Sequence, residues 1–102
     1  MIAYISIGNS DDKLSQMQWG KFYRKVDLVL QDVRRVGGQV HGRWTSEGSD
    51  YWQNACWCIE LPDNPQYIDG LKDDLAILAE TFGQDAIAWA EVLDTEFLSK
   101  KE

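Results

Sequence analysis

The sequence is poor in basic residues and has no long apolar run. Ten lysine and arginine residues stand against 17 acids, which gives a net charge of −7 in 102 residues. A protein that follows nucleic-acid phosphates needs a basic surface, and so does one that binds anionic lipid. We therefore expect no direct contact with nucleic acid and no membrane partner. The acidity favours either plain solubility or a surface that imitates nucleic acid and engages a basic site on another protein.

Two further absences bear on location and size. No apolar stretch approaches the roughly 20 residues that cross a bilayer, and the start MIAYISIGNSDD lacks the basic and apolar regions of a signal peptide. These features predict a cytoplasmic protein. A chain of 102 residues can bury one core but not two, so we expect a single domain over 1–102.

Cysteine is also scarce. Cys56 and Cys58 are the only two, and both fall in one predicted strand. Residues two apart in an extended chain have Cα atoms about 6.5–7 Å apart, which is the outer limit for a disulfide. Reduced thiols are therefore the simpler interpretation.

The segment 52–61, WQNACWCIEL, predicts the central strand. Its apolar residues alternate with small or polar ones, as in a strand with one face covered by helices and the other more open. Trp57 lies in the apolar row, whose members are Ala55, Trp57, Ile59 and Leu61. The opposite row contains Asn54, Cys56, Cys58 and Glu60.

Capping signals mark two helices. Ser15 and Gln18 form a capping-box pattern, and Asn64 before Pro65 is typical of a second helix start. Glycines at 37–38 and at 83 predict the two helix ends. Strands are predicted over 2–8, 39–45, 52–61 and 86–92, with 94–102 as a short terminal helix or a tail.

The element order is strand, helix, strand, strand, helix, strand. In about a hundred residues this order predicts an α+β fold of the ferredoxin-like βαββαβ type. We expect a four-stranded antiparallel sheet with two helices on one face, and the first and third strands in the centre.

This architecture predicts a working surface on the open sheet face. If the alanines of the last strand face the helices, Trp89 faces the open side, and we favour that arrangement. Aromatic rings beside the Arg43 guanidinium suit a flat, nucleotide-like ligand with a phosphate or carboxylate. The alternative is that a second copy covers the face in a homodimer. The predicted ligand-binding residues are Tyr4, Ser6, His41, Arg43, Asn54, Glu60 and Trp89.

Two other groups invite chemistry. Asp11 and Asp12 lie at an acidic rim that offers oxygen ligands to a divalent cation, although their spacing is not that of a calcium loop. His41 with Cys56 and Cys58 suggests a zinc site or an activated thiolate, but a fourth metal ligand is missing. Neither motif is specific, so we assign no catalytic residue and no cofactor.

The segments IGNSDDKL (7–14), WQNACWCIELP (52–62) and QDAIAWAEVLDTEFL (84–98) resemble small proteins of actinobacteria and their bacteriophages. The resemblance implies an accessory phage or prophage protein in the host cytosol. It favours a non-enzymatic inhibitor that binds a host or defence factor through its acidic surface, or sequesters a small ligand on the open face. The alternative is a small enzyme that acts on a nucleotide-like substrate at the acidic rim or the His41 face.

Overall fold

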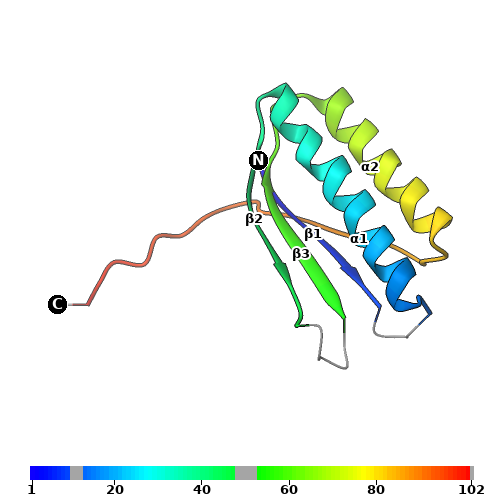
Figure 1. Cartoon of the computed structure of the whole chain (residues 1–102). Coiled ribbons are helices and arrows are strands. Elements are labelled where there is room, and N and C mark those ends of the chain that lie inside the picture. The colour runs from blue at the N-terminus through cyan, green and yellow to red at the C-terminus, as the bar shows by residue number, and fades with distance from the viewer. Residues whose placement is uncertain (10–12, 48–52, 102) are drawn as a thin grey trace.

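The computed structural model describes residues 1–9, 13–47 and 53–101. Two helices pack on one side of a four-stranded antiparallel sheet (Figure 1). This arrangement confirms the predicted α+β class. The elements are β1 (Ile2–Gly8), α1 (Gln16–Gln31), a 3₁₀ segment η1 (Asp32–Val36), β2 (Gln39–Thr45), β3 (Asn54–Glu60), α2 (Pro65–Thr81) and β4 (Ala88–Glu91).

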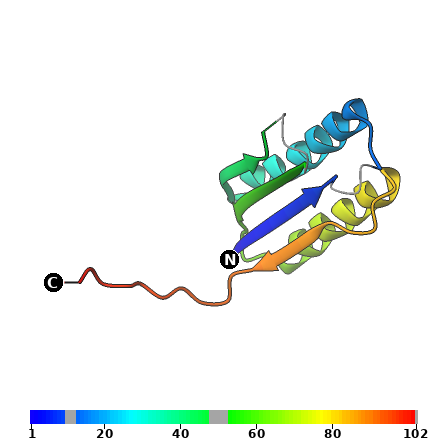
Figure 2. The same ribbon diagram turned by 90° about the horizontal axis from the view of Figure 1, so that it is seen from below.

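The strands lie in the order β2-β3-β1-β4, and every neighbouring pair is antiparallel. Figure 2 shows β4 at one edge of the sheet, with α2 behind it. In the register of the two central strands, Ile5 lies opposite Trp57. Directly opposite residues share a face, so this pair places the buried row of β3 beneath the helices together with that of β1.

The core lies between the sheet and the helices. Trp57 is fully buried, as its alternation predicts, and Phe22 and Leu30 of α1 pack above the sheet with Leu75 of α2. The buried residues of β3 and its end are those of the predicted apolar row, Ala55, Trp57, Ile59 and Leu61.

The predicted helix signals are confirmed. The Ser15 hydroxyl accepts a hydrogen bond from the Gln18 backbone, and the Gln18 side chain accepts one from the Ser15 backbone. At the start of α2 the Asn64 side chain accepts a hydrogen bond from the Tyr67 backbone amide, with Pro65 as the first helical residue. Gly37 ends η1 with φ +88°, a left-handed conformation that residues with a Cβ adopt at a cost.

Three expectations about the elements need correction or narrowing. The last strand is shorter than the predicted 86–92 because only Ala88–Glu91 pairs with β1. Residues 92–101 form an extended tail rather than a helix. The strand β2 is not regular, since its register shifts between Val40 and Gly42. This bulge changes which side chains face the helices.

Candidate functional site on the open sheet face

The open sheet face is the side that neither α1 nor α2 covers. Residues opposite one another in neighbouring strands share this face, so the registers of the sheet define its rows. One row contains Trp44, Cys56, Ser6 and Ala88; the next contains Gly42, Cys58, Tyr4 and Ala90. Most of these side chains are small, and the two large ones stand above them.

The two large side chains are aromatic and exposed. Trp44 is 59% exposed and Tyr4 is 44% exposed. They come from β2 and β1, which have β3 between them, so their backbones are about 10 Å apart across the sheet. Large aromatic side chains dominate interface energetics, and these two rise above the small side chains between them.

Four predicted site residues lie on this face. They are Tyr4 and Ser6 of β1 and Asn54 and Glu60 of β3, all at positions that alternate with the buried residues of their strands. Glu60 forms an ion pair with the amino group of Met1 at 3.2 Å. A hydrogen bond with the Cys58 thiol, together with the charge of that group, raises the pKa of the Tyr4 phenol above its ordinary value. At neutral pH Tyr4 is therefore a neutral hydrogen-bonding group.

Arg43 does not lie on this face, contrary to the prediction. It stands opposite Trp57 in the sheet, so it points to the side of the helices. There its Nη1 donates a hydrogen bond to Oδ2 of Asp27 in α1 at 2.8 Å. Its guanidinium also lies 5.9 Å from the centroid of the Tyr23 ring. The proposed anion-binding role of Arg43 on the open face is therefore wrong.

The partner of Arg43 also holds the central tryptophan. The Trp57 Nε1 donates to Oδ1 of Asp27 at 3.0 Å, and the Tyr23 ring stacks on Trp57 with centroids 5.2 Å apart. Burial alone would raise the pKa of Asp27. Hydrogen bonds from Trp57, Gln31 and Arg43 outweigh that effect and lower it below its ordinary value. The ionised carboxylate of Asp27 thus joins α1 to the sheet.

Trp89 lies on the helix side of the sheet and not on the open side, so its predicted position is also wrong. It stands opposite the buried Ile5, and its ring is half-buried against the core on the helix side. The Lys72 ammonium of α2 lies 5.0 Å from the centroid of that ring. The alanines at 88 and 90 face the open side instead. The short side chains that the prediction placed under a helix form part of the floor of the open face.

Sequence reasoning missed Trp44, because strict alternation places it with Val40 on the helix side. The extra residue of the bulge reverses the alternation, so Arg43 turns toward α1 and Trp44 turns outward. His41 lies within the bulge and is exposed. Gly42 in the strand interior was the available signal, since glycine there often marks a bulge.

The remaining candidates concern metals and thiols. Cys56 and Cys58 are half-buried and are not bonded to each other. Over 1–9, 13–47 and 53–101, no three His, Cys, Asp or Glu side chains lie together in a way that could hold a metal ion. The acidic-rim candidates Asp11 and Asp12 lie outside these residues.

Charge is unevenly distributed over the helices. The segment 16–36 of α1 and η1 carries five cations and two acids, and both acids pair with arginine. The segment 65–81 of α2 carries four acids and one cation. The negative charge of the helix layer is therefore concentrated on α2.

Comparison with known proteins assigns the chain to no family. No family model matches the chain, and no curated protein matches it significantly. Among the described residues, no helix combines the length and the hydropathy that a membrane crossing requires.

Proposed function

We propose that this protein is a non-enzymatic binding protein that engages a protein partner through its open sheet face. The observation that carries the proposal is the exposure of Trp44 and Tyr4 over a floor of small side chains. Aromatic residues supply much of the binding energy at the centres of interfaces. The small residues between them leave space for side chains of a partner. An aromatic side chain buries about 150–250 Å² when it is completely covered, and 59% of Trp44 is still exposed for a partner to cover.

The proposal includes a ferredoxin-like topology. The element order along the chain, the central position of β1 and β3, and the placement of both helices on one side support this assignment. A fold of this kind does not define an activity, so the function rests on the exposed face itself. The enzyme alternative would use the acidic rim or His41 with Cys56 and Cys58; the two cysteines lie on the open face, whereas His41 lies in the bulge of β2.

The charge of the face suggests the kind of partner. Among the described residues of the open face, the only acid is Glu60, and it pairs with the Met1 amino group. The contact surface is therefore nearly neutral although the chain carries a net charge of −7. A mostly apolar surface on the partner suits it best. The resemblance to actinobacterial and bacteriophage proteins supports a host or antiviral-defence factor as that partner.

The test compares baits that differ at one exposed residue. Wild type, Trp44→Ser and Ile77→Ser are used to capture proteins from an actinobacterial lysate at low and high salt. Ile77 is exposed to the same extent as Trp44 but lies on α2, so it serves as the control. We expect a specific protein that is captured by wild type and Ile77→Ser at both salt concentrations and is lost with Trp44→Ser. Equal capture by all three baits would refute the role of the open face.

A second candidate rests on the acids of α2. Asp69, Asp73, Asp74 and Glu80 are exposed on this helix, which suits an inhibitor that occupies a basic protein surface. Salt separates the two modes, because the Debye length falls from about 30 Å at 0.01 M to about 3 Å at 1 M. Binding through α2 should weaken steeply with salt and should be insensitive to Trp44→Ser.

A further inference from the structure

The extended tail 92–101 carries three large apolar side chains that are almost fully exposed. Leu93 is 91% exposed, Phe97 is 88% exposed and Leu98 is 84% exposed. The last sheet hydrogen bond runs from the Val92 amide to the Ile2 carbonyl at 2.9 Å. Beyond it the chain runs away from the sheet and the helices (Figures 1 and 2). Three large apolar groups close together in an acidic chain indicate a segment that is covered by something else.

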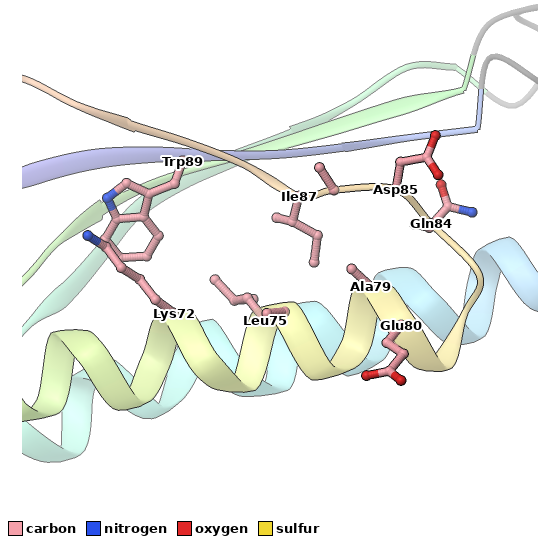
Figure 3. Close-up of a pocket in the computed structure, with 10 residues that line it drawn as sticks. Lys72, Leu75, Ala79, Glu80, Gln84, Asp85, Ile87 and Trp89 are labelled. Atoms are coloured by element: carbon pink, nitrogen blue, oxygen red, sulfur yellow. The ribbon is translucent and has the colours of Figure 1, made fainter.

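An apolar groove lies at the sheet edge from which this tail departs. It has a volume of about 650 Å³ and lies between α2 and β4. Its apolar lining consists of Leu75, Ala76, Ala79, Ala86, Ile87 and Trp89. Figure 3 shows Ile87 and Trp89 facing Leu75 and Ala79 across the groove. Because β4 is the last strand of the sheet, the backbone along one side of the groove has a free edge that can accept another strand.

We propose that the tail of a second copy adds to this edge as an antiparallel strand and places Leu93 and Phe97 in the groove. The exchange is reciprocal, so each copy supplies one tail and one groove. Two identical antiparallel strands are related by a two-fold axis, which gives a closed dimer. This contact uses the sheet edge and α2, whereas the proposed function uses the open face, so the two can be tested separately.

The alternation of the tail supports this assignment. In an extended chain Leu93, Thr95 and Phe97 point to one side, while Asp94 and Glu96 point to the other. These odd residues continue the odd series of 87–91, in which Ile87 and Trp89 face the helices. Opposite residues in an antiparallel pair share a face. An odd residue of the tail opposite an odd residue of β4 therefore enters the groove, and the acids stay outside it.

Charge supports the antiparallel direction. In that direction the end of the tail, with Lys100 and Lys101, lies toward the start of β4. Glu80 and Asp85 line the groove there, and Asp85 also lies 3.9 Å from Lys13. The opposite direction would bring the two lysines toward Lys72, which lines the other end. Lys72 forms an ion pair with Glu91 at 3.6 Å, so that end offers the two lysines no net negative charge, whereas Glu80 and Asp85 at the first end attract them.

The test measures the mass of the full chain in solution over about 1–100 µM, by sedimentation and by light scattering. We expect wild type to form a dimer. Phe97→Asp should weaken it by about tenfold or more, because a buried aromatic ring is replaced by a charge. Ala76→Arg should weaken it similarly by filling the groove. The control Ile77→Arg, on the neighbouring helix position outside the groove, should leave the dimer unchanged. All three positions are exposed within the domain, and circular dichroism verifies that each variant folds.

Mixing the two weakened variants gives the decisive result. The Ala76→Arg chain has an intact tail and the Phe97→Asp chain has an intact groove, so an equal mixture should regain a heterodimer with one good contact. A chain that stays monomeric throughout, including one whose tail folds into its own groove, would overturn the proposal. A dimer that resists both variants but is lost in Trp44→Ser would overturn it as well, because it would place the contact on the open face.

Discussion

The Asp27 carboxylate should be worth more to stability than any exposed acid of the chain. It accepts hydrogen bonds from Trp57 at 3.0 Å, Gln31 at 3.1 Å and Arg43 at 2.8 Å. Asp27→Ala removes these acceptors and leaves the fully buried Trp57 with an indole N–H that has lost its partner. A buried donor without a partner costs about 1–3 kcal/mol, and a hydrogen bond to a charged group contributes about 1.5–3 kcal/mol. We expect a loss of about 2–4 kcal/mol in the free energy of unfolding.

Double-mutant cycles divide this loss between the partners. The Trp57 indole is fully buried, so Asp27→Ala combined with Trp57→Phe should show a coupling energy of about 1.5–3 kcal/mol. The Arg43 side chain is half exposed, and ion pairs in contact with water contribute about 0.2–1 kcal/mol. The cycle with Arg43→Ala should therefore give the smaller coupling.

Urea unfolding followed by far-ultraviolet circular dichroism measures these energies without relying on tryptophan fluorescence. Asp73→Ala, at an exposed position of α2, is the control and should stay within about 0.5 kcal/mol of wild type. The pKa of Asp27 is lowered from its ordinary value of 3.8, so its contribution is present above that pH and is lost as pH falls through the lowered folded pKa. Wild type should thus lose more stability in acid than Asp27→Ala. If Asp27→Ala costs no more than Asp73→Ala, the assigned role of the carboxylate is wrong.

Three other changes test the packing and the second helix contact. Trp57→Ala should cost about 3–5 kcal/mol in urea unfolding, because it empties a large fully buried site; a cost below about 1 kcal/mol would contradict its burial. Gly38→Ala should cost about 1–3 kcal/mol, since its new Cβ would overlap the Glu60 carbonyl and the Val33 side chain, whereas Gly20→Ala meets nothing within 4 Å and should stabilise α1 slightly. Burial and a hydrogen bond to Asp32 raise the pKa of Tyr67 from 10.0 to about 12. The contribution of Tyr67 to the free energy of unfolding is therefore complete below pH 10 and is lost as the pH rises through about 12. Stability measured between those pH values should therefore fall more in wild type than in Tyr67→Phe, and equal slopes would refute the Tyr67 contact.

Local sequence patterns predicted the parts of the fold that local physics determines. The capping side chains of Ser15 and Asn64 satisfy backbone groups within one turn, so their meaning needs no knowledge of distant residues. The alternation around Trp57 was equally readable, because β3 lies in the sheet interior with a full apolar row. Ends and edges were harder to predict. β4 has one neighbour and a short pairing, so little in its sequence shows which row packs against the core.

The placement of Trp89 shows this difficulty. The alternating alanines and larger apolar residues of 86–90 could pack against a helix in two ways, either with the small residues inward for close approach or with the large ones inward for burial. The structure leaves a wide gap between β4 and α2, which the rings of Trp89 and the side chain of Ile87 partly fill. The width of that gap depends on where α2 packs, which is a tertiary property that the strand itself does not encode.

The errors at Arg43 and Trp44 have one common cause. Val40 stands opposite Ile59 and Arg43 stands opposite Trp57, and both of these partners face the helices. Positions 40 and 43 are an odd number of residues apart, so a regular strand cannot direct both to the same side. One extra residue is needed between them, and the bulge before Gly42 provides it. The bulge lets Val40 pack against the core and lets Arg43 pair with the Asp27 carboxylate on the same side of the sheet. It also turns the next side chain, Trp44, away from the core. The exposed aromatic ring on the open face is therefore a consequence of how the buried face is held in register.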